Sequence, residues 1–531
     1  MQQAATWVTH RFGGGWATDY GPTVYDAPNT GVMLLPFLSK AQNVVFTLNG
    51  GIQTMPGTTA FNGATLGASS TVKGIYDYWR QGTTGSATQK VVAHVDSRIV
   101  AADLSDGIFS NIATGLVSGA VPAYATFDDL LILSSDASAD VPKSWDQTTF
   151  QTLAGSPPNF SFSASHKNRM WGAGDMAHPS RLSYSVNLNP EDWAGLGSGS
   201  IDIDPSDGDA IVGIVSFGDD LWVFKGPNKG SIHRVTGASV TDFALVVFKR
   251  GITAAYHNSI FTLPNDLGFV SPHGTVHSLA TTDRFGDYTQ SALSFPINLS
   301  LRDSVSQGTY KNWWAINDLL SGRAIIAYTP SGQTRNTKLL MMDYRFQTLG
   351  EPFPRWAQWT SFGADSLAMV VDTGNRPRPF IGLNDGVIYK GNAADRMHKG
   401  NAVTPILTTP FLTYGADYQT KTLYVVGVEL APKNANPFTI SWQRDGQTLQ
   451  TETGVTQGGS DVLGPSTANV FTLNQSKLGG GRFMTRYTEA EEGGDFRSIQ
   501  YSLTDPAIHS NFEPHGILAQ LQSTGVSTEN A

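Results

Sequence analysis

Apolar residues in this chain recur at alternate positions, in short runs that Gly, Asp, Asn, Ser and Pro interrupt. Alternation with a period of two is typical of a β-strand with one buried face, whereas a helix repeats about every 3.6 residues. Long stretches with helical periodicity are hard to find, so the chain is predicted to be all-β. The clearest predicted strands are residues 90–95, 130–133, 211–215, 221–224, 259–263, 324–328 and 338–342.

Tight turns follow many of these strands and recur along the chain. They are marked by Gly107, Asp146, Gly230, Gly274, Gly332 and Gly386, which are separated by 39, 84, 44, 58 and 54 residues. The longest interval, 84 residues, equals two intervals of about 42 residues. Repeats of about 40 to 50 residues with several strands each are typical of β-propeller blades. We therefore expect a β-propeller of about seven blades. The same turns also occur in other multi-stranded proteins, which leaves such an arrangement open.

The chain is long enough for several domains, because 531 residues exceed what one hydrophobic core usually serves. The turn markers stop near residue 400, and later strands such as 437–444 are separated by polar loops, which indicates a β-sandwich. The first 75 residues show little alternation before 43–48. We predict three parts: an N-terminal arm or docking segment over 1–75, a β-propeller over 76–400 and a β-sandwich over 401–531.

Composition excludes several classes of protein. A net charge of −9 leaves no overall basic surface of the kind that binds duplex nucleic acid. The absence of cysteine excludes a disulfide framework, a thiolate metal site and a cysteine nucleophile. No run reaches the ~18 apolar residues that a spanning helix needs, so no membrane span is expected. With 40% hydrophobic residues the chain can bury sizeable cores, which excludes overall disorder.

Two groups of residues are candidate metal ligands. Segment 202–209 holds four aspartates, but its glycine lies seventh rather than sixth and its twelfth position is Gly213, unlike a calcium-binding EF-hand loop. An acidic turn between strands is the favoured interpretation. His273 and His277 would lie ~13 Å apart on one strand, too far to share an ion, and no third ligand is evident.

Paired carboxylates are a candidate catalytic pattern in this sequence. Glycosidases hold two carboxylates about 5 to 10 Å apart, and the sequence offers the adjacent pairs Asp128-Asp129 and Asp219-Asp220. Neighbouring residues of a strand point to opposite faces, so neither pair forms such a site by itself. Phosphate-binding loops and the Gly-x-Ser-x-Gly motif are also absent. We expect no catalytic, cofactor-binding or metal-binding residues and no enzyme activity.

Aromatic residues have two interpretations, packing and ligand stacking. Segment 166–171 combines cations with Trp171, and a cation stacked on this indole would be an ordinary structural contact. The remaining tryptophans are spread over the expected blades rather than clustered, which favours core packing. They include Trp145, Trp193, Trp222, Trp313, Trp314, Trp356 and Trp359.

Short motifs in a fixed order resemble a known family. In the N-terminal part they are Gly14-Gly15-Trp16-Ala17-Thr18-Asp19, Ala41-Gln42-Asn43-Val44, Gly50-Gly51 and Met55-Pro56-Gly57-Thr58. Further along they are Val72-Lys73-Gly74-Ile75-Tyr76-Asp77-Tyr78, Ser144-Trp145-Asp146, His166-Lys167-Asn168-Arg169-Met170-Trp171, Leu182-Ser183-Tyr184-Ser185, Pro190-Glu191-Asp192-Trp193 and Val223-Phe224-Lys225-Gly226. This order is similar to that of the tail-nozzle or tail-hub (stopper-like) virion proteins of short-tailed bacteriophages.

The resemblance implies a structural protein of the virion tail, assembled in the cytoplasm of the bacterial host. Copies of the chain would form a homohexameric ring below the portal and head–tail adaptor proteins. The ring would conduct or retain viral DNA, which passes without sequence-specific binding, and it would anchor tail fibres, spikes or a tail plug. The family offers no catalytic residues or cofactors to transfer to this chain.

Two alternatives remain open at the level of sequence. One is a glycan-binding or glycan-cleaving β-propeller, such as an adhesin or depolymerase, whose tryptophans and acidic residues would contact the substrate. The other is an intracellular scaffold propeller unrelated to phages. Under this alternative, the order of the N-terminal motifs would be a coincidence.

Overall fold

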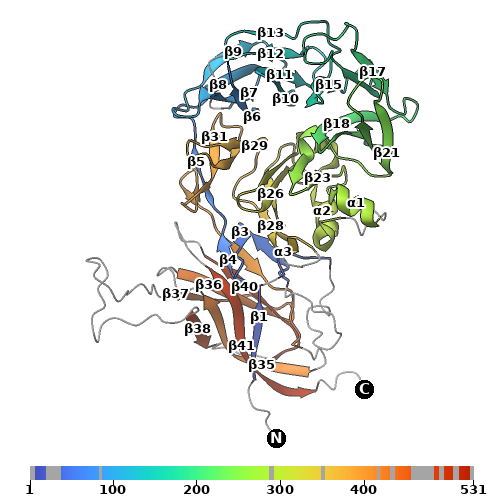
Figure 1. Ribbon diagram of the computed structural model, residues 1–531. Helices are drawn as coiled ribbons and strands as arrows, with labels where there is room; N and C mark the ends of the chain where they lie inside the picture. Colours follow the sequence, from blue (N-terminus) through green and yellow to red (C-terminus); the bar gives the residue numbers. More distant parts are fainter. Residues whose placement is uncertain are drawn as a thin grey trace. The chain divides into compact units, whose positions relative to one another are not determined.

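The computed structural model describes residues 6–12, 14–19, 37–67, 69–82, 87–285, 292–348, 353–414, 419–430, 437–455, 484–489, 495–505 and 513–526. Within them the protein consists of β-strands in many small sheets, which confirms the all-β prediction (Figure 1). The α-helices are short: α1 (Leu279–Phe285), α2 (Asn298–Ser304) and α3 (Arg345–Thr348). In this described part of the chain, no helix is long and apolar enough to cross a membrane.

The chain divides into two compact units. Unit 1 comprises Met1–Thr58, Met341–Ser361 and Ala393–Ala531, and unit 2 comprises Thr59–Leu340 and Phe362–Asn392. Both units are therefore assembled from segments that lie far apart in the sequence. The division into 1–75, 76–400 and 401–531 stays a prediction.

Unit 2 contains four successive antiparallel sheets of four strands, each in chain order. The first sheet has β6 (Val72–Arg80), β7 (Thr88–Val95), β8 (Arg98–Asp103) and β9 (Ser110–Thr114). The second has β10 (Pro122–Phe127), β11 (Leu130–Ser135), β12 (Lys143–Trp145) and β13 (Phe150–Thr152). The third has β14 (Phe162–His166), β15 (Arg169–Ala173), β16 (Arg181–Tyr184) and β17 (Gly199–Asp202). The fourth has β18 (Ala210–Phe217), β19 (Asp220–Gly226), β20 (Ser231–Thr236) and β21 (Ala244–Arg250).

Three further groups of strands follow in the same way. The fifth sheet has β22 (Ile260–Leu263), β23 (Asp266–Val270) and β24 (Val276–Ser278). The sixth group has β25 (Trp314–Asp318), β26 (Arg323–Tyr328) and β27 (Lys338–Asp343). The seventh sheet has β29 (Ser366–Val371), β30 (Pro377–Gly382), β31 (Ile388–Ala393) and β5 (Gly57–Ala60). Strand β5 thus completes a sheet whose other strands come about three hundred residues later.

The first strands of successive sheets pack beside one another. Strand β6 packs beside β10, β10 beside β14, β14 beside β18, β22 beside β25, β25 beside β29, and β29 beside β6. The 3-10 helix η2 (His257–Ser259), which leads into β22, packs beside both β18 and β25. Buried side chains fill the space between neighbouring sheets: Trp171, Leu182, Ile214 and Val223 belong to one core of the third and fourth sheets. These buried side chains join the third sheet to the fourth in one hydrophobic core.

The predicted turns lie where the sequence indicated, between consecutive strands. Asp146 accepts hydrogen bonds from the backbone N–H groups of Thr148 and Thr149, at 2.9 and 2.6 Å, in the β12–β13 turn. Gly386 has φ 69° in the β30–β31 turn, and a Cβ atom there would lie 2.2 Å from the carbonyl oxygen of Gly67. The positions of these turns can therefore be predicted from the residue types within each turn.

Unit 1 joins N-terminal strands to C-terminal ones. One sheet has the order β1 (Thr6–Arg11), β41 (Pro514–Val526), β35 (Gln419–Leu430) and β38 (Met484–Glu489), with β39 (Asp495–Phe496) also on β35. A second set of neighbours is β28 (Arg355–Trp359), β2 (Lys40–Gln42), β34 (Ile406–Thr408), β40 (Ile499–Thr504), β36 (Pro437–Arg444) and β37 (Gln450–Val455). Two-stranded pairs are β3 (Val44–Phe46) with β4 (Ile52–Thr54) and β32 (Met397–His398) with β33 (Asn401–Ala402).

Candidate functional site

The acidic segment 202–209 holds a lysine rather than presenting an open cation site. The fully buried Nζ of Lys225 lies 2.8 Å from each carboxylate oxygen of Asp207 and donates to the carbonyl oxygens of Ile203 and Asp204, at 2.6 and 2.9 Å. The ammonium group thus has the oxygen partners that a metal ion would need. This arrangement agrees with the interpretation of the segment as an acidic turn between strands.

Asp209, a second carboxylate of this segment, also accepts hydrogen bonds. Asp209 is buried and accepts the backbone N–H groups of Asn228, Lys229 and Gly230, at 2.8, 2.8 and 2.9 Å. Burial works to raise the pKa of Asp207, but the hydrogen bonds from Lys225 and from the backbone outweigh it, so the pKa lies below its usual value. These carboxylates are therefore anionic partners that hold the β17–β18 connection against β19 and the turn after it.

The two histidines considered as metal ligands lie in different surroundings. His273 is exposed in the turn before β24, whereas His277 is buried on β24 with its Nε2 2.8 Å from the Thr275 hydroxyl. His277 also stacks on Phe269, with ring centroids 5.7 Å apart. Among the described residues, no three His, Cys, Asp or Glu side chains are grouped as metal ligands.

The paired carboxylates lie at hairpin turns and bind different partners. Asp129 accepts the backbone N–H groups of residues 81 and 82, at 2.7 and 2.9 Å. Asp219 pairs with Lys167 at 3.1 Å and Asp220 with Arg234 at 3.3 Å. Asp129, Asp219 and Asp220 therefore each have their own hydrogen-bonding or ionic partners.

Arg169, one of the cations of segment 166–171, lies over the ring of Tyr184. Arg169 is buried, donates to the carbonyl oxygens of Ser185 and Gly197 at 2.7 and 2.6 Å, and lies 5.6 Å from the ring centre of Tyr184. Trp171 is fully buried, and its Nε1 donates to the carbonyl of His166 at 3.1 Å. Arg169 thus has a structural role, with Tyr184 as an aromatic partner.

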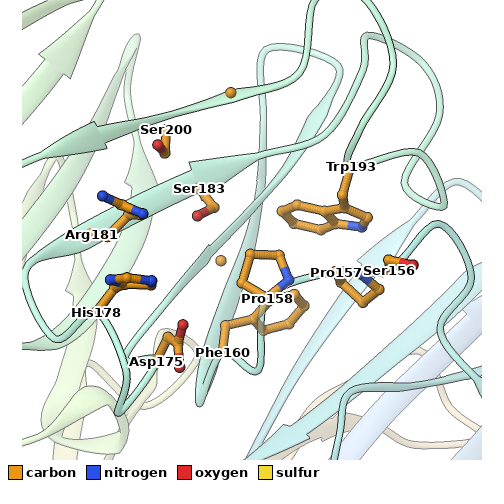
Figure 2. Close-up of a pocket in the computed structure, with 12 residues that line it drawn as sticks. Ser156, Pro157, Pro158, Phe160, Asp175, His178, Arg181, Ser183, Trp193 and Ser200 are labelled. Carbon is orange, nitrogen blue, oxygen red and sulfur yellow. The ribbon is translucent and has the colours of Figure 1, made fainter.

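A pocket of about 470 Å³ opens beside the third sheet of unit 2 (Figure 2). Its apolar side is formed by Pro157, Pro158, Phe160, Gly172 and Trp193. Gly172 on β15 is required there, because a Cβ atom would lie 2.4 Å from the ring of Phe160. The absence of a side chain at this position lets the phenyl ring lie directly on the sheet.

Trp193 is the exception among the eight tryptophans that the sequence singled out. The other seven are buried, in agreement with the expected packing role, whereas Trp193 is only partly buried and lines the pocket. Its Nε1 donates to the carbonyl of Pro190 at 2.9 Å, and its ring centre lies 5.2 Å from that of Phe160. These contacts fix the orientation of the indole.

Polar groups form the other side of the pocket, where Figure 2 shows Asp175, His178 and Arg181 across from Trp193. Arg181 on β16 makes a two-pronged ion pair with Asp202 on β17, at 2.8 and 3.0 Å. This hydrogen bonding raises the pKa of Arg181 and lowers that of Asp202. Asp175 accepts the N–H of Ala177 at 3.0 Å, and the exposed His178 lies in the same β15–β16 connection.

No motif in the sequence groups these residues. Trp193 belongs to the motif Pro190-Glu191-Asp192-Trp193, but Asp175, His178 and Arg181 lie outside every quoted motif. They meet because the β15–β16 connection and the long β16–β17 connection both reach the same face of the third sheet. The sequence feature that comes nearest to indicating the pocket is the pair Pro157-Pro158, which is followed two residues later by Phe160.

Comparisons with known proteins give no family for this chain. No family model and no curated protein matches it. Among similar solved structures is the extracellular domain of a protein described as a hybrid two-component system of B. thetaiotaomicron. The two are 7% identical with a TM-score of 0.30, and the match covers 78% of this chain and 43% of that one, so the chain spans less than half of that structure. A likeness at this level carries no argument about function.

Proposed function

We propose that this chain is a structural component of a bacteriophage tail, built as a seven-bladed β-propeller with an N-terminal arm and a C-terminal β-sandwich. Copies of it form a ring below the portal and adaptor proteins. The ring conducts or retains viral DNA and anchors fibres, spikes or a plug. Each part of this proposal has its own support.

The propeller is supported by the packing of the first strands in unit 2. First strands lie beside one another from β6 to β18 and from β22 through β29 back to β6, and η2 lies beside both β18 and β25. Strand β5 completes the seventh sheet, and the following residues continue the pairing: the N–H of Phe61 donates to the carbonyl of Ile388 at 2.8 Å. Closure of the last blade by an earlier strand suits a circular arrangement of blades, because it ties the two ends of the circle together.

The observation that carries the tail assignment is that the motif residues occupy positions which require them. Asn43 has φ 55°, and its Oδ1 accepts the N–H groups of Thr360 and Ser361 at 2.7 and 3.2 Å. A Cβ atom on Gly57 would lie 2.1 Å from the carbonyl of Asp395. Two residues of the N-terminal motifs that resemble tail-nozzle proteins thus have structural roles in unit 1, which supports the proposal.

The motifs of the first half of unit 2 have the same character. Trp145 packs on Tyr78, with ring centres 5.5 Å apart, and thereby joins the first and second sheets. Lys225 holds the acidic segment, and Arg169 holds two carbonyl groups of the third sheet. These polar residues stabilise the fold, which suits a virion protein whose function is mechanical.

Charge and symmetry agree with a duct. A chain with a net charge of −9 offers no overall basic surface that would retain DNA through counterion release, so DNA can slide past it. A ring of identical subunits needs heterologous interfaces that close by rotation, and six copies below a portal are one such closure. The glycan-cleaving alternative has weaker support, because the carboxylates that would serve it bind backbone groups and cations.

Quantitative mass spectrometry of purified phage particles tests this proposal. The ratio of this chain to the portal protein is measured after particles are separated from soluble lysate proteins. A ratio near one half is expected for six copies under a twelve-membered portal. Absence of the chain from the particles would reject the tail assignment, and a ratio well above one would reject a single ring.

A further inference from the structure

We propose that the pocket beside the third sheet of unit 2 is a binding site for a neutral saccharide, with a pyranose ring stacked on Trp193. This inference does not rest on the tail assignment. It rests on a pocket in which a fixed indole lies across from a set of hydrogen-bonding groups (Figure 2).

The indole supplies a preformed stacking surface. Trp193 is held by its hydrogen bond to the Pro190 carbonyl and by its contact with Phe160, so little rotational freedom is lost when a ligand binds. It is also the one tryptophan of the eight considered that is not buried in a core. One face of a pyranose ring presents C–H groups with slight positive charge, which suit the negative face of an aromatic ring.

The opposite side of the pocket supplies both donors and acceptors. Asp175 is an acceptor, Arg181 is a donor, and the hydroxyl groups of Ser183 and Ser200 act as either. Neighbouring hydroxyl groups on a sugar need the same mixture. The bidentate ion pair with Asp202 holds the guanidinium of Arg181 in place before any ligand arrives.

The charges of the pocket favour a neutral ligand over a nucleotide or another phosphate. Arg181 is paired with Asp202, and Asp175 adds a second carboxylate. Even with His178 protonated, these four groups sum to no net positive charge. A phosphate group would therefore meet no electrostatic attraction, although a base could stack on the indole.

The size of the pocket fits this class of ligand. Its volume of about 470 Å³ lies within the range of about 300 to 1,000 Å³ that is common for small-molecule sites. Ser156, His178 and Ser200 are exposed at its margin, so a ligand can enter from solvent and a longer glycan can extend outward.

Saturation-transfer NMR on the full chain tests the proposal. The probes are the methyl glycosides of glucose, galactose, mannose, rhamnose and N-acetylglucosamine, with AMP as the phosphate-bearing comparison. We expect at least one glycoside to bind the natural protein and AMP to bind more weakly. Trp193→Ala should weaken glycoside binding by about tenfold, and Trp193→Phe, which keeps an aromatic face, by no more than about threefold.

Two further variants separate loss of the site from loss of the fold. Trp79→Ala removes a tryptophan that is 41% exposed and lies outside the pocket, and it should leave binding unchanged. His178→Ala changes an exposed residue at the pocket margin and should weaken binding by about threefold while leaving the thermal unfolding midpoint unchanged.

Three results would overturn the saccharide site. They are the absence of binding for every glycoside, binding that survives both Trp193→Ala and His178→Ala, and tighter binding of AMP than of any glycoside. Because these measurements use isolated protein, their outcome is independent of the ratio measured in phage particles. Either proposal can fail without the other.

Discussion

The Nζ atom of Lys225 lies 2.8 Å from both carboxylate oxygens of Asp207, and the lysine side chain is fully buried. Two backbone carbonyl groups complete the surroundings of the ammonium. A buried cation with this number of oxygen partners behaves as an internal replacement for a metal ion. Its contacts with Asp207, Ile203 and Asp204 hold the acidic segment 202–209 in place.

Removal of this ammonium should destabilise unit 2 strongly. Lys225→Met leaves the Asp207 carboxylate and two carbonyl groups without their donor, and we expect a loss of about 3 kcal/mol or more. Lys90→Met is the matched control, because Lys90 and Asp103 form a partly exposed ion pair that should contribute less than about 1 kcal/mol. Guanidinium unfolding followed by tryptophan fluorescence measures both changes. Equal losses in the two variants would contradict the special role of Lys225.

Calcium should have no effect on stability. The ammonium of Lys225 already occupies the oxygen-rich centre of segment 202–209, and like charges in that space would repel. We expect the thermal unfolding midpoint to be the same with millimolar calcium and with a chelator. A higher midpoint in calcium, lost on addition of the chelator, would mean that the segment binds the ion in solution.

Acidification should weaken the fold below about pH 6.5, through buried histidines. Burial lowers the pKa of His94 to about 4, against the opposing effect of Asp140. The unfolded state has a pKa near 6.5 and binds the proton first, so stability falls as pH drops from about 6.5 to about 4. The slope for one such group is about 1.4 kcal/mol per pH unit.

The variant His94→Gln tests this origin of the pH dependence. It should flatten the fall of the unfolding midpoint between pH 6.5 and pH 4.5 without removing it, because burial also lowers the pKa of His257 to about 4. Thermal unfolding at a series of pH values measures the slope. If the natural protein and the variant lost stability in parallel, His94 would not be the group responsible.

The β30–β31 turn should not tolerate a side chain at Gly386. This residue has φ 69°, and its Cβ would lie 2.2 Å from the carbonyl oxygen of Gly67, so Gly386→Ala should cost about 3 kcal/mol. Gly332→Ala is the control: φ is 77°, but no atom lies within 4 Å of its Cβ, and about 1 kcal/mol is expected. Comparison of the two unfolding midpoints isolates the steric contact. Equal midpoints would mean that segment 62–67 can move away.

The candidate site was much less predictable than the strands. The sequence predicts a packing role for Trp193 and seven other tryptophans, and only those seven are buried. Nothing in the sequence connected it to Asp175, His178 or Arg181, which are polar residues of ordinary appearance. Their grouping follows from the course of two connections over one sheet face, and a pattern of residue types does not specify that course.

Local residue patterns determined the strands and turns of this protein. Alternation of apolar residues acts within a few positions, and Asp146 and Gly386 act on their own turns, so these features could be recognised without knowledge of neighbours. Tertiary structure decided which distant segments meet. The pairing of β1 with β41, the addition of β5 to β31 and the burial of Lys225 against Asp207 depend on sheet packing. The physical reason is that the edge of a β-strand can pair with any other strand edge, and a buried charge can pair with any opposite charge. The packing of the folded chain selects one partner for each.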